Sequence, residues 1–316
     1  MKYIESLREG ERINEIYLCK VKQSALTKAG KPYDTLILQD KTGTLDAKIW
    51  EPGSVGIDEF DSLDYIAVMG DITSFQGNLQ LNVKRVRKVQ EGEYDPKDYL
   101  PVSDKDIDQM YEELKGLIAS IKEVHLKKLL ESFFVEDADF EKRFKFHSAA
   151  KTVHHGFVGG LLEHSLSVAK HCDYFAAYYP MLSRDLIVTA AIFHDIGKLE
   201  ELSVFPENDY TDDGQLLGHI IIGTEMVGDR IRTIPDFPKG LASELKHCIL
   251  AHHGELEFGS PKKPALPEAL ALSFADNIDA KMETVREIFN NVPENNQEWQ
   301  GYNRLLESNI RRSGKL

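Results

Sequence analysis

The residues best suited to chemistry in this chain are an adjacent histidine and aspartate, His194-Asp195, in the stretch Ala-Ala-Ile-Phe-His-Asp-Ile-Gly-Lys-Leu-Glu-Glu. The pair offers a metal ion one neutral nitrogen and one anionic oxygen. Further candidates occur at loose intervals on both sides of it, namely His164, His219, His252, His253 and Asp276. Ligands of these types can surround a divalent metal, and such metals commonly activate water for attack on phosphate.

Each of these polar residues lies in a stretch that otherwise has the composition of a buried helix. Leu-Leu-Glu-His-Ser-Leu surrounds His164, and Leu-Ser-Phe-Ala-Asp-Asn surrounds Asp276. Burying an unpaired carboxylate costs several kcal/mol, so Asp195 and Asp276 need partners. A shared cation would serve both. A single histidine of this kind is more often a hydrogen-bonded core residue, but the set as a whole favours a metal site.

The elements that must position these side chains are helices. Apolar residues three and four apart predict helices over 104–121, 126–134, 160–179, 184–201, 216–231, 241–253 and 267–290. Ser103 is the expected N-cap of the first, with Asp106 in the capping-box position. His194-Asp195 then falls near the end of the fourth, which Gly197 should terminate. We expect residues 104–316 to form one helical domain.

The N-terminal residues 1–90 have the pattern of strands instead. Short runs rich in β-branched and aromatic residues, partly alternating with polar ones, predict strands near 16–21, 33–40, 44–50, 65–70 and 79–86. Five strands in so short a stretch suit a small closed barrel. The sequence pattern from Leu36 to Trp50 resembles that of the nucleic-acid-binding members of the OB-fold. Residues 91–103 are polar, contain two prolines and are expected to be a linker.

Barrels of this kind hold single strands by stacking bases on aromatic side chains and by following the backbone with cations. The candidates for nucleic-acid binding are Tyr33, Trp50, Phe75, Lys48, Lys84 and Arg85. Packing in the barrel core or rim is the alternative interpretation of Tyr33 and Trp50, and it has equal weight for each residue taken singly.

The composition limits the class of protein. The net charge is −14 over 316 residues, but residues 1–90 contain 13 basic and 13 acidic side chains, so the excess lies in the helical part. Overall acidity is therefore a weak argument against a nucleic-acid partner. The N-terminus lacks the pattern of a signal peptide, no apolar run approaches the length of a membrane span, and the three cysteines are scattered. These features predict a cytoplasmic protein without a membrane partner.

The ligand pattern resembles a known family. His164, His194-Asp195 and Asp276 look like the four-ligand signature of HD-domain phosphohydrolases, an all-α fold, and His219 with His252-His253 resembles the subclass that binds two metals. An OB-fold followed by such a domain, with Lys-Thr-Val-His-His-Gly-Phe at 151–157, is similar to the YhaM family of bacterial 3′→5′ exoribonucleases. That family includes the cmp-binding factor proteins of staphylococci.

The resemblance implies roles for the candidate residues. Asp195 would bridge two ions, with one site completed by His164, His194 and Asp276 and the other by His219 with His252, His253 or both. Lys198 would contact a phosphate oxygen, or it is a solvated lysine at a helix end. His154 and His155 would contact the scissile phosphate or act as a general acid, or they are structural.

The same resemblance implies a metal and a substrate. Histidine-rich ligands suit Mn²⁺, Fe²⁺, Co²⁺, Ni²⁺ or Zn²⁺ better than Mg²⁺ or Ca²⁺, and the family points to manganese. The leading hypothesis is a metal-dependent 3′→5′ exonuclease acting on single-stranded RNA, with DNA as a further substrate. The alternatives are a phosphodiesterase for a nucleotide or cyclic dinucleotide, and a DNA-binding factor linked to replication. A homo-oligomer is left open.

Overall fold

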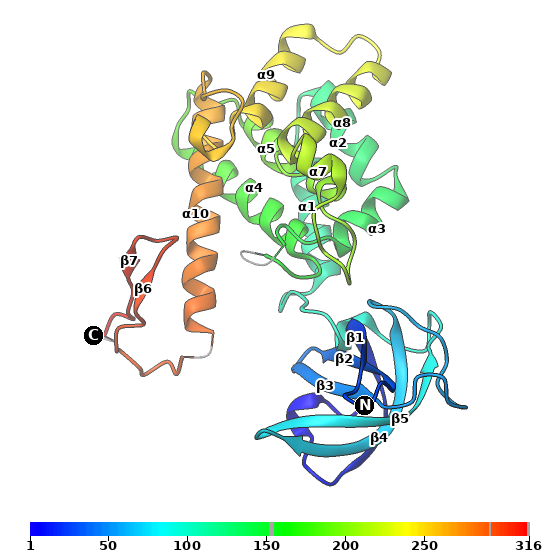
Figure 1. Cartoon of the computed structure of the whole chain (residues 1–316). Coiled ribbons are helices and arrows are strands. Elements are labelled where there is room, and N and C mark those ends of the chain that lie inside the picture. Colours follow the sequence, from blue (N-terminus) through cyan, green and yellow to red (C-terminus); the bar gives the residue numbers. More distant parts are fainter. Residues whose placement is uncertain (152–154, 291, 315–316) are drawn as a thin grey trace. The chain divides into compact units, whose positions relative to one another are not determined.

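The computed structural model describes residues 1–151, 155–290 and 292–314. The chain forms two compact units, Met1–Pro101 and Val102–Leu316 (Figure 1). The first is a β-barrel and the second is mainly helical. No helix in the described ranges combines the length and apolar character that a bilayer crossing needs. The predicted fold class, a barrel followed by a helical domain, is confirmed.

Five strands close the barrel of the first unit. They are β1 (Arg12–Leu26), β2 (Pro32–Asp40), β3 (Gly43–Ile49), β4 (Tyr65–Phe75) and β5 (Asn78–Lys88). Their order is β1-β2-β3-β5-β4, with β1 pairing to both β2 and β4 and with β3 running parallel to β5. This order is that of the OB-fold, a five-stranded Greek-key barrel.

Alternation along β2 shows why these residues form a closed sheet. Leu36 and Leu38 are buried in the barrel, whereas the side chains between and beside them are partly exposed. A bulge in the pairing of β4 with β5 at Met69 and Gly70 bends the sheet. A Cβ on Gly70 would lie 2.2 Å from the carbonyl oxygen of Asn82, so the close approach at this bend requires glycine.

The segment expected as a linker packs largely on the barrel. Tyr94 stacks on Tyr65 with ring centroids 3.8 Å apart, Tyr99 is buried, and Asp98 accepts a hydrogen bond from the Tyr3 hydroxyl at 2.7 Å. The first unit therefore extends to Pro101. Two tyrosines in a segment that is otherwise polar account for this extension, because burying their rings outweighs the polarity around them.

The second unit contains helices of very different length. They are α1 (Ile107–Ala119), α2 (Val124–Phe134), α3 (Ala138–Phe146), α4 (Gly160–Tyr178), α5 (Arg184–Phe193), α6 (Lys198–Glu201), α7 (Asp212–Leu216), α8 (His219–Thr233), α9 (Lys239–Leu250) and α10 (Pro267–Phe289). Short 3₁₀ turns lie at Ile4–Ser6, Pro96–Asp98 and Leu256–Phe258 (η1, η2 and η3), and a small hairpin, β6 (Tyr302–Asn303) and β7 (Ser308–Asn309), follows α10.

Three details of the predicted helices were wrong. The single helix predicted over 184–201 is broken, since α5 ends at Phe193 and α6 begins at Lys198. Helix α3 was not predicted, although Asp137 caps it by accepting from the backbone N–H of Phe140 at 3.1 Å. Asp106 is the N-cap of α1, whereas Ser103 donates to the buried carboxylate of Glu163.

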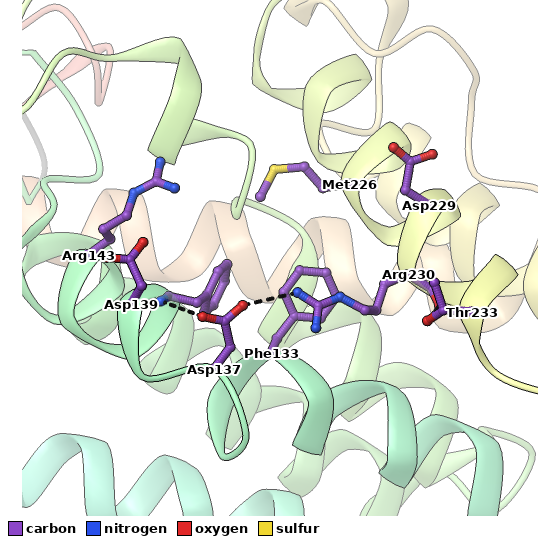
Figure 2. Close-up of a pocket in the computed structure, with 9 residues that line it drawn as sticks. Phe133, Asp137, Asp139, Arg143, Met226, Asp229, Arg230 and Thr233 are labelled. Atoms are coloured by element: carbon purple, nitrogen blue, oxygen red, sulfur yellow. Dashed lines mark hydrogen bonds and ion pairs between the residues drawn. The ribbon is translucent and has the colours of Figure 1, made fainter.

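The core of the second unit surrounds α4 and α5, which are buried along most of their length. At its edge, α2, α3 and α8 enclose a pocket of about 340 Å³ (Figure 2). Arg230 lies 4.4 Å above the Phe133 ring and forms an ion pair with Asp137 at 3.2 Å. Its cation is thus already partnered, and none of the predicted metal ligands lines this pocket.

Candidate metal centre

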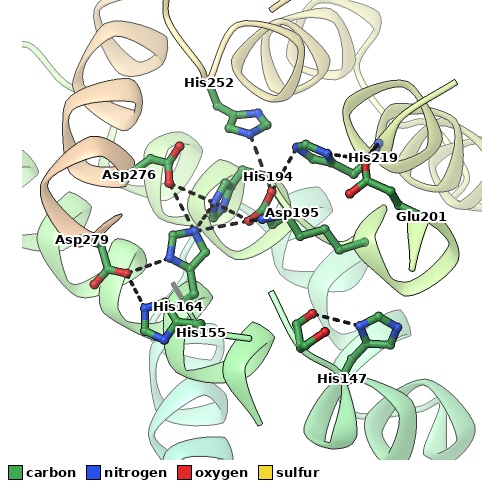
Figure 3. A network of polar contacts seen from close by, with 12 residues as sticks. His147, His155, His164, His194, Asp195, Glu201, His219, His252, Asp276 and Asp279 are labelled. Carbon is green, nitrogen blue, oxygen red and sulfur yellow. Dashed lines mark hydrogen bonds and ion pairs between the residues drawn. The ribbon is translucent and has the colours of Figure 1, made fainter. Parts of the chain in front are cut away.

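All seven predicted metal ligands lie around one centre in the second unit, and Figure 3 labels them apart from His253. They come from five segments that are distant in sequence. His164 lies in α4, His194-Asp195 directly follows α5, and His219 is the first residue of α8. His252-His253 follows α9, and Asp276 lies in α10. The broken helix after Phe193 has a functional consequence, because the break leaves His194 and Asp195 at a helix end.

Three of these side chains form the first half of the centre. The Nε2 atom of His164 lies 3.1 Å from Nε2 of His194 and 3.2 Å from Oδ1 of Asp276. All three offer ligand atoms within 4.8 Å of one another. Oδ2 of Asp195 approaches the same two imidazoles, at 3.3 Å from His164 and 3.4 Å from His194.

Three histidines form the second half. The ligand atoms of His219, His252 and His253 lie within 4.8 Å of one another. Oδ1 of Asp195 is 3.4 Å from Nε2 of His219 and 3.7 Å from Nε2 of His252. The two oxygens of one carboxylate therefore face different histidine sets, which is the geometry that a bridging ligand requires.

Local backbone contacts orient most of these imidazoles. The Nδ1–H groups of His194 and His252 each donate, at 2.7 Å, to the carbonyl three residues earlier, at Ala191 and Ile249. His253 donates in the same way to Phe258 at 2.8 Å. Each bond fixes the tautomer that leaves the lone pair on Nε2, the form in which histidine binds a metal.

The electrostatics of the centre suit a cation. Burial lowers the pKa of His194, His252 and His253, which keeps these imidazoles neutral. Burial alone would also lower the pKa of His164, but hydrogen bonds to Asp195, Asp276 and Asp279 raise it well above its usual value. Three carboxylates thus favour positive charge at this point of a buried site.

Unpaired buried atoms test whether a metal fits. Oδ1 of Asp195, Nε2 of His219 and Nε2 of His252 have no hydrogen-bond partner among the described residues, and all three point into the second half of the centre. A buried polar atom without a partner costs about 1–3 kcal/mol. A divalent ion would satisfy all three together, so the second half fits a metal. The donor set of the first half, two imidazoles and a carboxylate within 4.8 Å of one another, is of the same kind.

The environment of Asp195 involves one more predicted residue. Burial would raise the pKa of this carboxyl, but Lys198 and the surrounding histidines hold it well below its usual value. Nζ of Lys198 lies 2.6 Å from Oδ2 of Asp195 and is largely buried. The lysine therefore neutralises a ligand carboxylate in this structure and is not the solvated helix-end residue of the alternative interpretation.

A second layer of side chains supports the ligands. Oδ2 of Asp279 accepts from Nδ1 of His164 at 2.7 Å and lies 3.0 Å from Nε2 of His155 (Figure 3). Glu201 accepts from Nδ1 of His219 at 2.9 Å. His155 is buried behind His164 and does not line the pocket beside the ligands, which favours its structural interpretation. His154 lies outside the described residues.

A glycine contact allows the turn after Asp195 to approach α8 closely. A Cβ on Gly197 would lie 2.0 Å from the carbonyl oxygen of His219 and 2.6 Å from the backbone nitrogen of Gly223. No larger side chain fits between these backbones. The backbone after Asp195 can therefore pack directly against α8, which carries His219.

The predicted nucleic-acid residues lie on the first unit, but not all in one patch. Tyr33 and Trp50 stack with centroids 5.4 Å apart, and Nζ of Lys48 lies 5.3 Å above the Tyr33 ring. The Trp50 side chain is half exposed and its Nε1 donates to Asn82. The exposure of Trp50, beside the partly buried Tyr33 on β2 and Lys48 on β3, disfavours the core interpretation of Trp50.

The other three candidates are separate. Phe75 is exposed at the tip of the β4–β5 hairpin. Lys84 forms an ion pair with Asp71, and Arg85 packs beside Gly56.

The role of Glu201 as the hydrogen-bond acceptor of His219 was not predicted from the sequence. The sequence feature that could have indicated this role is its position six residues after Asp195, at the end of Lys-Leu-Glu-Glu.

Comparisons with known proteins agree with this geometry. A family model described as HD domain matches residues 161–281, a range that contains all seven predicted ligands. The 3′-5′ exoribonuclease YhaM of Geobacillus sp. (strain WCH70) is 34% identical over 281 residues, covering 87% of this chain and 84% of that protein. The proteins of the same name from Bacillus velezensis (strain DSM 23117 / BGSC 10A6 / LMG 26770 / FZB42) and Bacillus subtilis (strain 168) are each 34% identical over 275 residues, covering 86% of both chains.

Among solved structures, the second OB-fold domain of replication protein A from Methanococcus maripaludis matches at 19% identity with a TM-score of 0.22, over 29% of this chain and 98% of that one. The identity and coverage of the full-length relatives are sufficient to assign the family. This chain belongs to the YhaM family.

Proposed function

We propose that this protein is a metal-dependent 3′→5′ exoribonuclease that hydrolyses the phosphodiester bonds of single-stranded RNA. The observation that carries the proposal is the convergence of seven ligand side chains on one buried centre with three unpaired atoms. The relatives named YhaM supply the substrate class and the direction of degradation. They favour an RNA polymer over a free nucleotide or cyclic dinucleotide.

Two divalent ions would be held by this chain. His164, His194 and Asp276 would bind one, His219, His252 and His253 the other, and Asp195 both. Such ions supply Lewis acidity, which lowers the pKa of water and offsets the charge of a phosphate. Five imidazoles and two carboxylates favour a transition metal, and we propose Mn²⁺, as the family resemblance implies.

The remaining residues would prepare the centre for this chemistry. Asp279 and Glu201 hold His164 and His219 in the ligating tautomer. Lys198 offsets the negative charge of Asp195 and is close enough to the centre to interact with an incoming phosphate when that ion pair opens.

The barrel would hold the strand. Tyr33 and Trp50 offer a stacked aromatic surface beside Lys48, and Phe75 is the last residue of β4, next to the β4–β5 loop. Strands 2 and 3 and the loop between strands 4 and 5 are the surfaces on which OB-folds bind oligonucleotides. Base stacking does not distinguish ribose from deoxyribose, so we expect single-stranded DNA to bind as well.

The test is an incubation of the purified protein with 5′-labelled single-stranded RNA. With Mn²⁺, the labelled products should shorten progressively from the 3′ end, and EDTA should abolish the reaction. A parallel series with Co²⁺, Fe²⁺, Ni²⁺, Zn²⁺ and Mg²⁺ ranks the metals. Intact RNA with every metal would contradict the proposal, and cleavage at internal positions would contradict its directional part.

A further inference from the structure

A pocket of about 510 Å³ opens directly beside the candidate metal centre. His252, His253 and Asp276 belong to both. The rest of the wall comes from α10, from η3 and from the turn of the C-terminal hairpin, and its residues are Phe258, Ser273, Asn277, Ala280, Lys281, Thr284 and Leu305. Its volume is within the usual range for small-molecule sites, about 300–1,000 Å³.

Helix α10 presents one continuous face to this pocket. The lining residues Ser273, Asn277 and Lys281 follow one another at intervals of four, as do Asp276, Ala280 and Thr284. Positions four apart lie above one another on a helix. Serine and alanine on this face leave room for a ligand.

Two side chains on that face have no partner among the residues that the structure describes. Asn277 and Lys281 are both exposed, and neither forms a hydrogen bond or ion pair with any residue that the structure describes. The amide of Asn277 can both donate and accept, and the ammonium of Lys281 donates three hydrogen bonds. Lys281 lies five residues after the metal ligand Asp276, which is about 7.5 Å along the helix axis.

The apolar part of the pocket contains an aromatic ring. Phe258 is 61% exposed although it is linked to the centre, since its carbonyl accepts the hydrogen bond from His253 at 2.8 Å. Gly259, with φ of 88°, ends η3 directly after it. Leu305, also exposed, belongs to the turn between β6 and β7. An exposed ring held next to a metal centre is suited to stacking a base.

We propose that this pocket binds the 3′-terminal nucleoside of the RNA strand, with the phosphate of that nucleotide directed to the metal centre. This inference rests on the proposed exonuclease function and assigns the residues that recognise its substrate. The base packs on Phe258 and Leu305, while Asn277 and Lys281 hydrogen-bond to the sugar hydroxyls and to acceptors on the base. The combination of ring, amide and cation suits a nucleoside better than a bare phosphate.

The proposal is tested by isothermal titration calorimetry of the full chain with adenosine 5′-monophosphate in the presence of Mn²⁺. Phe258→Ala should weaken binding about tenfold or more, because stacking one base contributes about 1–3 kcal/mol. Lys281→Ala should weaken it about fivefold. Inorganic phosphate, titrated in the same way, should bind the variants and the wild type alike.

Two matched variants control for the loss of an exposed ring or lysine. Phe274 lies on α10 and is 58% exposed, but it does not line the pocket; Phe274→Ala should bind the nucleotide normally. Lys128, exposed on α2, serves in the same way as Lys128→Ala. Because all four positions are on the surface, the variants should fold, as circular dichroism melting would show.

A spectroscopic measurement gives an independent readout of stacking. RNA with 2-aminopurine at its 3′ end should lose fluorescence on binding to the wild type in EDTA, where no cleavage occurs, and should lose much less with Phe258→Ala. Equal affinity of wild type and Phe258→Ala for the nucleotide, together with equal quenching, would overturn the pocket assignment. Failure of the exonuclease proposal is separate, since it appears as intact RNA in the cleavage assay.

Discussion

The two units differ in where they place the residues that would act on nucleic acid. In the barrel, Tyr33, Lys48 and Trp50 lie on the outside of a sheet whose interior is a cluster of aliphatic and aromatic side chains. In the helical unit, His194, Asp195 and His252 are among the most buried residues. One unit carries its candidate binding residues on a surface, and the other builds its candidate metal centre into its core.

The difference determines how each site should respond to mutation. An exposed stacking residue makes contacts that are largely independent of its neighbours, so its removal weakens binding by that contact alone. The buried ligands share hydrogen bonds with one another and with Asp279, Glu201 and Lys198. A change at one member therefore leaves others unsatisfied, and the effect should be large and not additive.

The largest effect is expected for Asp195→Asn, which removes the charge that faces both histidine sets. RNA degradation in Mn²⁺ should fall by about a thousandfold or more, because Asp195 is the carboxylate whose two oxygens face both histidine sets. Single-strand affinity, measured by filter binding in EDTA, should be unchanged. The exposed Asp213→Asn on α7 is the control. An active Asp195→Asn protein would remove the contrast between the two units.

A smaller loss is expected for Asp279→Asn, which keeps the shape of the side chain but weakens the acceptor of His164. Metal affinity measured by calorimetry should fall about 10–100-fold, the usual effect of losing a carboxylate behind a histidine ligand. Excess Mn²⁺ should restore most of the activity. Glu287→Gln, exposed on the same helix, should have no effect; equal metal affinity in both variants would show that Asp279 is only structural.

In the barrel, Trp50→Ala should reduce single-strand affinity by about 1–3 kcal/mol, the contribution of one stacked base. KM for a long RNA should rise while kcat stays the same, since the chemistry lies in the other unit. Tyr174→Ala, which removes an exposed ring from the helical unit, is the matched control. A fall in kcat with unchanged KM would mean that the two sites are not separable in this way.

The smallest effect concerns folding. Glu163 is buried, and although burial would raise its pKa, Ser103 and Lys105 lower it. A carboxyl whose pKa is lower in the folded state stabilises the protein above its ordinary pKa and loses that contribution as the pH falls through the folded value. Glu163→Gln should lower the free energy of unfolding by about 1 kcal/mol at pH 7. The expected loss is small because Lys105 is half exposed, so that solvent screens its ion pair with Glu163.

That difference should shrink below about pH 4.5, the ordinary pKa of the group. Urea unfolding of wild type and variant at pH 7 and pH 4 measures it. A gap that is constant with pH would show that packing, and not the charge of Glu163, accounts for the loss.

The residues that converge on the candidate metal centre could be predicted because each is a titratable residue in an otherwise apolar stretch. Their supporting residues were harder to recognise. In the sequence, Glu201 resembles an ordinary surface glutamate next to Glu200. In the structure, α6 packs against α8, and the Glu201 carboxylate accepts hydrogen bonds from both the backbone N–H and the ring of His219. Contacts between helices depend on side-chain direction, which periodicity does not contain.

The barrel shows the same limit in another form. Its strands follow from alternation, but the packing of Tyr94 and Tyr99 on the barrel does not, since both occur among charged residues and prolines. The unpredicted α3 has a clear cap at Asp137 and buried phenylalanines four apart at Phe140 and Phe144. It was overlooked because its remaining residues are mostly charged.

The contact between Gly197 and α8 has a consequence for how such a centre can change over evolution. The backbone at Gly197 lies directly against the backbone of His219 and Gly223, so exchanging ligand side chains would leave this approach unchanged. We expect relatives to differ in metal preference through the donor atoms and the residues that hydrogen-bond to them. The distance between the backbone at residue 197 and α8 should stay the same.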